Sequence, residues 1–378
     1  MVFLVNLARV VFAPLLEPIR AATGASDATL GLLATLVWAG SALPRLPTGY
    51  LLTRLRRPTV VFGSGVVLTA GATFTALTRD PDLLLVGAFT MGLASGVYLV
   101  AANPLVTELF PERPGRALGQ HGVAAQLAAV AAPALVSAAL LVDSWRTTLQ
   151  LVAVAAALMT IGFTLVARRA EFPAAGADDT DFAGAIRTQW RLVLTGVLAI
   201  GATTLVWNGV FNFYVTYLNT LSLSGGTGRL MLLIVFAAGL PAFYVSGRLA
   251  DRLPNLPYLI GLIVAFTGCI IVLPAVGGRW PLVAFSAVLG YVVHSIFPAA
   301  DTYLLGSLPD QHRASAYAAY SGGMMLLQAP GSVIVGTLRD AGVSFPDIFG
   351  AMSAGLVVVS GVLLVLYVGS RLPTSAQE

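Results

Sequence analysis

Long apolar runs recur along the whole chain, and their number limits what it can fold into. A helix needs about 17–25 apolar residues to cross a bilayer. The sequence holds twelve runs of that kind with polar residues between them, at 2–21, 29–52, 59–78, 83–107, 116–141, 145–167, 192–218, 229–250, 256–276, 280–305, 313–338 and 345–369. The chain is therefore predicted to be an all-α membrane protein with twelve transmembrane helices.

The composition also favours a lipid environment. Hydrophobic residues make up 57% of the 378 residues and charged residues only 10%, whereas soluble domains carry about 25% charged residues. Lysine is absent, so the net charge of +4 comes from arginine. No basic arm interleaved with aromatic residues occurs, so nucleic acid is not an expected partner. The first run lacks a basic region before it, and eleven runs follow, so a cleaved signal peptide is not predicted.

One long polar segment divides the runs six and six. Residues 168–191 are rich in Ala and Asp, and they predict a linker between a first six-helix bundle, 1–167, and a second, 192–378. With the N-terminus inside, thirteen arginines fall in inside loops and six in outside loops. Basic loops stay in the cytoplasm. We therefore expect both termini and the linker on the cytoplasmic side of the cell membrane.

The two halves repeat at a fixed offset of 198 residues. The stretch "GYLLTRLRRP" begins at Gly49 and "GRLADRLPNL" at Gly247, while "AANPLVTELFPE" begins at Ala101 and "AADTYLLGSLPD" at Ala299. One offset shared by two separate polar loops is the pattern expected of a duplicated transporter architecture. It predicts two pseudo-symmetric six-helix halves.

These loops resemble those of the major facilitator superfamily of secondary transporters, whose second loop reads G-x-x-x-D-R-x-G-R-R. The first copy here keeps the glycine and arginine but has Thr53 in place of the aspartate; the second copy keeps the aspartate. The resemblance implies the fold of that superfamily and alternating access. It also implies close helix crossings at the glycines and gating roles for Gly49, Arg54, Gly247, Asp251 and Arg252.

Two arginines lie inside predicted spans, where a charge at the centre costs about 2.5–3.5 kcal/mol. Arg45 lies eight residues before Thr53 and Arg9 eight residues after Met1, each about 12 Å along a helix. That depth disfavours escape of the charge to the interface. Both are predicted to face the cavity and bind an anionic substrate through the planar guanidinium group. A purely structural pairing of either arginine is the alternative.

Narrower resemblances surround both arginines. "GSALPRLPTG" around Arg45 is similar to the second span of nitrate/nitrite porters, which carry another arginine at the repeat-equivalent position. Here that position is Phe243. "NLARVVFAP" around Arg9 resembles the first span of organic-anion members of the superfamily. The site is therefore expected to be asymmetric, with its charge in the first half.

Other polar residues within the spans are weaker candidates. Asn208 and Asn212 are four residues apart and share a helix face, where they would contact substrate or tie helices together. Asp301 is expected nearer the cytoplasmic end, as part of a gate. The further candidates for substrate contact are Tyr98, Gln126 and His294. One cysteine and three histidines give no metal-ligand or disulfide spacing, so neither metal nor cofactor is expected.

The leading hypothesis is a monomeric secondary transporter of a small anionic solute, driven by proton or sodium symport or by exchange. A proton-coupled drug or metabolite exporter is the alternative, although the glycines of that class's G-P-x-x-G-G turn are missing at 132–137. A membrane sensor or scaffold would be expected to carry a sizeable soluble appendage. An enzyme is not predicted, because no phosphate-binding loop or cluster of catalytic acids and histidines occurs.

Overall fold

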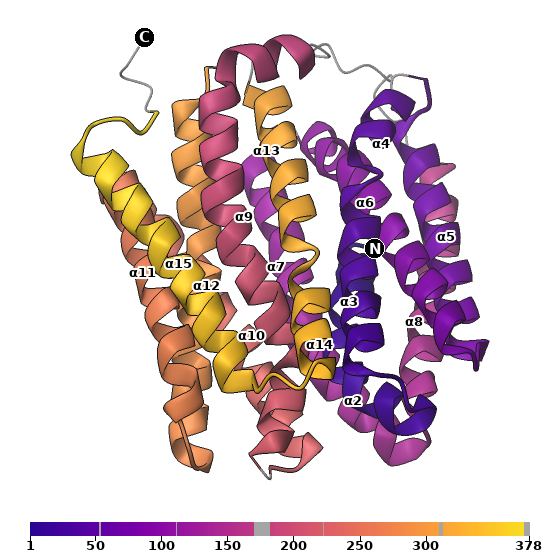
Figure 1. The fold of residues 1–378 in the computed structure, drawn as a ribbon. Coiled ribbons are helices and arrows are strands. Elements are labelled where there is room, and N and C mark those ends of the chain that lie inside the picture. The colour runs from indigo at the N-terminus through magenta and orange to yellow at the C-terminus, as the bar shows by residue number, and fades with distance from the viewer. Residues whose placement is uncertain (53, 111, 170–181, 222, 310–312, 374–378) are drawn as a thin grey trace. The chain divides into compact units, whose positions relative to one another are not determined.

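The computed structural model describes residues 1–52, 54–110, 112–169, 182–221, 223–309 and 313–373. This part of the chain forms helices without strands (Figure 1). Ten of the helices found there are long and apolar enough to cross a membrane, and the bent pair α1 (Val2–Val10) and α2 (Phe12–Thr23) forms an eleventh span. The prediction of an all-α membrane protein is confirmed.

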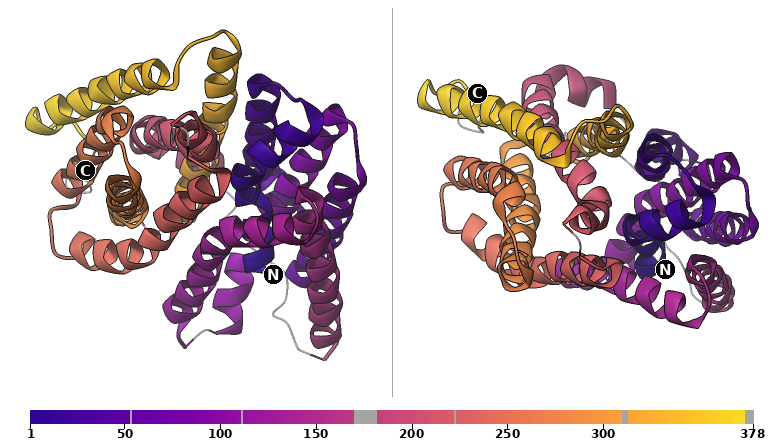
Figure 2. Two further views of the ribbon diagram at one scale, coloured as in Figure 1. Left: turned by 90° about the horizontal axis from the view of Figure 1, so that it is seen from below. Right: turned by 60° about the horizontal axis from the view of Figure 1, so that its bottom comes forward.

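The helices gather into two units. The first comprises Met1–Ala177 together with Asn212–Leu233. Figure 2 shows its indigo to magenta helices gathered into a bundle. Besides α1 and α2, its helices are α3 (Asp27–Ala42), α4 (Arg45–Leu51), α5 (Arg57–Leu77), α6 (Pro81–Leu109), α7 (Pro114–Val142) and α8 (Trp145–Ala167).

The second unit comprises Asp178–Phe211 and Ile234–Glu378. Its helices are α9 (Phe182–Thr220) and α10 (Gly225–Ala250), both shared with the first unit, then α11 (Asn255–Val272), the short 3₁₀ helix η1 (Leu273–Ala275), α12 (Arg279–Ser307), α13 (Arg313–Gln328), α14 (Gly331–Asp340) and α15 (Phe345–Val368). The predicted linker 168–191 is partly helical, because α9 already begins at Phe182. Residues 170–181 of that linker lie outside the described residues.

Two polar contacts hold the end of α9 and the start of α10 in the first unit. The carboxylate of Glu17 accepts hydrogen bonds from Thr216 Oγ1 at 2.7 Å and from Asn219 Nδ2 at 3.2 Å. Arg229 Nε donates to Ser137 Oγ at 2.9 Å. Since polar side chains in apolar surroundings are costly unless they are bonded, these contacts help to keep residues 212–233 with this bundle.

Prolines explain why three predicted spans are interrupted. A proline inside a helix removes the hydrogen bond to the residue four positions earlier and crowds that carbonyl group. Pro14 stands four residues after Val10, where α1 and α2 meet at a bend of 46°. Pro47 stands four residues after Leu43, where α3 gives way to α4, and Pro330 lies between α13 and α14. The predicted span 313–338 is therefore two helices rather than one.

A close glycine contact recurs in both units at the 198-residue offset. A Cβ placed on Gly92 of α6 would overlap the carbonyl oxygen of Val37 on α3. A Cβ placed on Gly290 of α12 would overlap the carbonyl oxygen of Val235 on α10 in the same way. Each residue of the second pair follows its counterpart by 198 positions. Small residues let helix backbones approach closely in lipid, so the sequence repeat has a matching packing contact in each unit.

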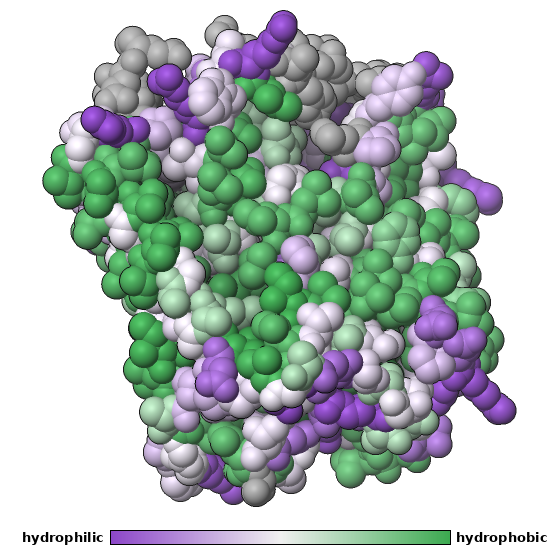
Figure 3. Space-filling model, viewed as in Figure 1, coloured by the Kyte–Doolittle hydropathy of each residue, from purple (hydrophilic) through white to green (hydrophobic). Residues whose placement is uncertain are grey.

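The exposed surface suits a membrane-embedded chain. On the face shown in Figure 3, apolar side chains cover the middle of the helices, and hydrophilic side chains gather toward their ends. Large apolar side chains are widely exposed, among them Leu158 at 64% and Val358 at 65%. In water this exposure would oppose folding, whereas in lipid tails it costs nothing.

We predict that Gly92→Ala lowers stability by about 1–3 kcal/mol, because the added methyl group overpacks a backbone contact that cannot yield. The repeat-equivalent Gly290→Ala is expected to behave alike. Gly162→Ala is the matched control, since a Cβ there meets no described atom within 4 Å. Thermal unfolding in detergent measures the difference, and equal melting temperatures for Gly92→Ala and Gly162→Ala would contradict the packing argument.

Candidate functional site

The first unit holds an arginine inside its bundle without an acidic partner. Arg9 of α1 donates through Nη2 to Asn6 Oδ1, and its guanidinium carbon lies 5.0 Å from the ring centre of Trp38 on α3. Its Nε atom is buried and makes no hydrogen bond to the described residues. The three ion pairs within the described part of the chain do not include Arg9; they are Arg20–Glu17, Arg20–Asp27 and Arg57–Glu108.

The structure brings the two predicted arginines near each other. Arg45 is half-buried at the start of α4, directly after the Leu43–Pro44 break. It lies close enough to Arg9 for the two positive charges to repel. Two like charges held together in a low-dielectric interior raise the free energy of the empty site, and a bound anion would lower it.

A second polar cluster, of which the sequence pointed only to Tyr98, adjoins this arginine. The hydroxyl of Tyr98 on α6 lies 3.2 Å from Nε2 of His121 on α7, and the two rings stack with centres 5.9 Å apart. Asn6 Nδ2 donates to the backbone oxygen of Ala125, one helical turn beyond His121. Besides Tyr98, only the presence of His121 within a predicted span hinted at this cluster, because its partners come from other helices.

Arg9 lies at a different depth in the bundle from the one expected from the sequence. The expected depth is counted from Met1 as the end of the span. The backbone of Val2 makes a hydrogen bond with the Tyr98 hydroxyl. Tyr98 stands 11 residues before Leu109, the last residue of α6, or about 16 Å along the helix. The first residues of α1 therefore lie beside the middle of α6, and Arg9, seven residues later, lies about 10 Å farther from the Leu109 end of α6.

The second unit builds an aromatic cluster around His294. The imidazole of His294 on α12 is 4% exposed, and its Nδ1 donates to Gly290 O at 2.7 Å. Four aromatic rings have their centres 5.9–6.3 Å from it: Trp207, Phe236, Phe243 and Phe297. Because a carbonyl oxygen only accepts, Nδ1 carries a hydrogen in this arrangement.

The cationic and aromatic clusters occupy repeat-equivalent positions. The second-unit residues 198 positions after Arg9, Trp38 and Arg45 are Trp207, Phe236 and Phe243. Arg9 lies over Trp38 in one unit, and Trp207 meets Phe236 edge to face with centres 6.4 Å apart in the other. The same backbone framework thus presents positive charge in the first unit and aromatic rings in the second.

The remaining predicted contact residues are buried or half-buried within α9 and α7. Asn208 is fully buried in α9, and the single hydroxyl hydrogen of Ser332 on α14 is shared between Asn208 Oδ1 (2.7 Å) and the Asn208 backbone oxygen (3.1 Å). This contact supports the helix-tying role of Asn208. Asn212 is also buried, in the part of α9 that belongs to the first unit, and Gln126 is half-buried next to Ala125 of α7.

The predicted gating residues show fewer contacts than expected. A Cβ at Gly49 or Gly247 would meet no described atom within 4 Å, so the close crossings expected there are not seen and occur at Gly92 and Gly290 instead. Arg54 is exposed and contacts Tyr50, both by a hydrogen bond and over its ring. Within the described part of the chain, Asp251 and Arg252 form no ion pair.

Asp301 has a clear partner. Its carboxylate accepts a hydrogen bond of 2.7 Å from the hydroxyl of Tyr317 on α13. The described residues hold no group of three His, Cys, Asp or Glu side chains close enough to bind a metal. The gating role of Asp301 stays a prediction.

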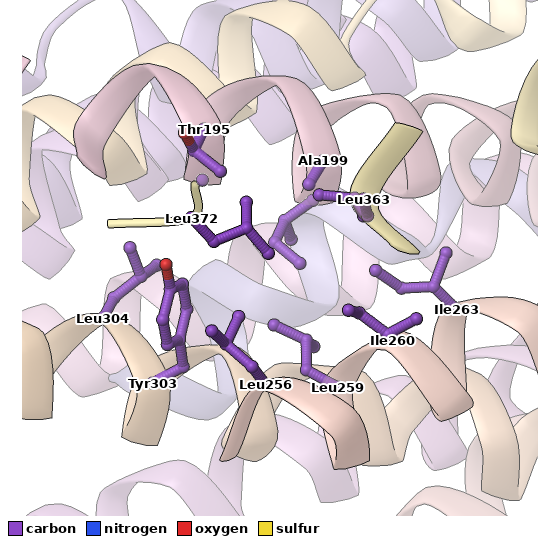
Figure 4. Close-up of a pocket in the computed structure, with 12 residues that line it drawn as sticks. Thr195, Ala199, Leu256, Leu259, Ile260, Ile263, Tyr303, Leu304, Leu363 and Leu372 are labelled. Carbon is purple, nitrogen blue, oxygen red and sulfur yellow. The ribbon is translucent and has the colours of Figure 1, made fainter. Parts of the chain in front are cut away.

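A small pocket in the second unit is not a solute site. It lies between α9, α11, α12 and α15, and Leu372 closes it (Figure 4). The labelled side chains that point into it are apolar apart from Thr195 and Tyr303. Its free space holds little more than a water molecule.

Comparisons with known proteins agree with this architecture. The family model of the Major Facilitator Superfamily matches residues 1–278. An uncharacterised MFS-type transporter of Yersinia pestis is 30% identical over 123 residues. That alignment spans 32% of this chain and 32% of the relative, so it covers only about a third of either protein.

Solved transporters share the fold at low sequence identity. A bacterial homologue of the human lysosomal transporter Spinster, in an inward-facing and occupied state, has a TM-score of 0.75 at 16% identity and covers 98% of this chain and 95% of its own. The nucleoside transporter NupG has a TM-score of 0.79 at 14% identity, with 97% and 98% covered. A D-xylose–proton symporter has a TM-score of 0.74 at 15% identity, with 95% and 94% covered.

We predict that Ser332→Ala lowers stability by about 0.6–1.7 kcal/mol, the range measured for hydrogen bonds between membrane helices. The change removes the donor to Asn208 that ties α9 to α14. Ser137→Ala, which removes an acceptor of Arg229 in the first unit, provides a comparison. An unchanged melting temperature in detergent for Ser332→Ala would contradict the helix-tying role of Asn208.

Proposed function

The chain belongs to the major facilitator superfamily, and on that premise we propose that it carries a small organic anion across the cytoplasmic membrane by alternating access. Coupling to a proton or sodium gradient, or to exchange, is part of the proposal, as is a monomeric state. The coarser statement, a multi-pass transporter of this superfamily, rests on the family match and the shared fold.

The observation that carries the anion proposal is the arginine pair. Arg9 is held by Asn6 and by the Trp38 ring and forms no ion pair within the described residues. Arg45 is near enough for the two positive charges to repel. Uncompensated charge within a membrane bundle is costly and marks substrate or ion pathways. A guanidinium group keeps its charge at any physiological pH and matches the geometry of a carboxylate. A carboxylate bound here would relieve the repulsion between the arginines.

The second unit carries no counterpart of the arginine pair. Where a symmetric site would repeat the arginines, this unit carries Trp207 and Phe243. Phe243 is 39% exposed, although its ring packs against His294. Within the first unit itself, the Trp38 ring lies 5.0 Å from the Arg9 guanidinium carbon, so an apolar surface adjoins the charge. Aromatic faces favour apolar and aromatic groups, so this unit suits a solute with a carboxylate and an apolar body.

We predict that Arg9→Gln abolishes binding of benzoate and that Arg45→Lys weakens it at least tenfold, because a point charge replaces a bidentate fork. Asn6→Asp should also abolish binding while the protein stays folded, since its carboxylate would neutralise Arg9. Equilibrium binding of radiolabelled benzoate, lactate and nitrate to the full chain in lipid nanodiscs measures this, with benzoate expected to bind best.

Arg146→Gln is the matched control for these variants. Arg146 also lies over a tryptophan, Trp145 at 4.3 Å, but its guanidinium donates to Thr78 O. The Arg146→Gln variant should bind benzoate with wild-type affinity. Two outcomes would contradict the anion site. In the first, Arg9→Gln and Arg45→Lys both bind benzoate with wild-type affinity. In the second, neither of these variants folds and Asn6→Asp binds benzoate normally.

The proposed orientation has its own test. In a Cys269→Ser background, Arg56→Cys should resist a membrane-impermeant maleimide added to intact cells, because loop 2–3 is expected inside. Arg79→Cys, in the next loop, should react; both arginines are exposed. External labelling of position 56 but not 79 would reverse the topology.

A further inference from the structure

The Tyr98–His121 pair has no role in the anion proposal. It joins two helices of the first unit by the 3.2 Å contact between the Tyr98 hydroxyl and His121 Nε2. Tyr98 is 5% exposed, whereas His121 is only half-buried. The imidazole is therefore the more accessible group of the pair, and the hydroxyl is the more buried one.

The tyrosine hydroxyl suits both protonation states of its partner. A hydroxyl has one donor hydrogen and two acceptor lone pairs. It can donate to Nε2 of neutral imidazole, and its oxygen can accept from the Nε2 hydrogen once the ring is imidazolium. The Tyr98 ring stacks on the His121 ring with centres 5.9 Å apart, which keeps the two groups together. His121 can gain or lose a proton without breaking the contact.

The pair lies close to the arginine site along two helices. His121 precedes Ala125 by one turn of α7, and the Ala125 carbonyl accepts from Asn6, whose Oδ1 accepts from Arg9. By helix rise, the imidazole and the guanidinium group are separated by on the order of 10 Å. At that distance and in a partly dry bundle, one added charge changes the affinity for an anion severalfold.

Few other charges face His121 from the helices that contact α7, which are α1, α2, α6 and α8, together with α10 through Arg229 and Ser137. Next to the imidazole are Tyr98 of α6 and the amino group of Met1, which precedes α1. The remaining charged groups of these helices and of the two ends of α7 are Arg9, Glu17, Arg20, Asp82, Glu108, Glu112, Arg113, Arg116, Asp143, Arg146 and Arg168, and from α10 the contacting group is Arg229. Glu17, Arg20 and Glu108 are already paired.

We propose that His121, supported by Tyr98, is a proton-binding site that couples one proton to anion binding at Arg9 and Arg45. The inference rests on the proposed anion site. A proton from water adds to the neutral imidazole, the imidazolium adds a third positive charge near the two arginines, and the anion binds more tightly. Loss of the proton on the other side of the membrane weakens binding and favours release.

Binding of benzoate to the full chain in nanodiscs at pH 5.5 and 8.0 tests the proposal. Benzoate and both arginines stay ionised across this range, whereas histidine changes its charge within it. The wild type should bind benzoate about fivefold more tightly at pH 5.5. His121→Gln should bind with equal affinity at both pH values, near the wild-type affinity at pH 8.0.

Two variants address the rival titrating groups of the second unit. His294→Gln and Asp301→Asn should both keep the fivefold pH effect. If His121→Gln keeps it as well, or if Asp301→Asn alone removes it, the proton site lies elsewhere and the proposal is overturned while the anion site stands. If the wild type binds no benzoate, lactate or nitrate at either pH, the result contradicts both the anion site and the proton site.

Tyr98→Phe keeps the test decisive if His121→Gln does not fold. The phenyl ring preserves the stacking but removes the acceptor for the imidazolium, so the midpoint of the pH dependence should move to lower pH. A purely structural contact would lower the melting temperature and leave that midpoint where it is in the wild type. An unmoved midpoint therefore contradicts the proposal.

Discussion

The first unit depends on the close approach of α3 and α6 at Gly92. With no side chain there, the helix backbones meet at the Val37 carbonyl, and in lipid this packing stands in for the hydrophobic effect. The crossing places Trp38 on α3 beside α1, and so beneath the guanidinium group of Arg9. Gly290 and Val235 set the same crossing in the second unit.

The duplicated framework carries different chemistry in its two copies. Repeat-equivalent positions hold Arg9 and Arg45 in one unit and Trp207 and Phe243 in the other. Arg9 is held by an amide and an aromatic face rather than by a carboxylate. For the anion site proposed here this arrangement is favourable, because a permanent ion pair would satisfy the charge that an anion would otherwise meet.

Much of the fold was predictable because span length and loop charge act locally. Apolar runs marked nearly every helix, and the polar landmarks at Gly49 and Gly247 revealed the repeat. The bends at Val11 and Leu43 follow from Pro14 and Pro47, yet their size depends on packing. The site was predictable only in part: depth singled out Arg9 and Arg45, whereas the partners Asn6, Trp38 and His121 gave no signal of their own.

The sequence by itself determined that this chain crosses the membrane many times in two related halves and keeps two arginines within its spans. Those properties follow from hydropathy, periodicity and the cost of charge in lipid, which each segment carries alone. Only the tertiary structure decided that Arg9 meets Asn6 and Trp38, that Tyr98 meets His121, and that Asn208 ties α9 to α14. The physical reason is that most of these contacts join different helices, and the relative rotation of packed helices is set by side-chain packing rather than by any one segment.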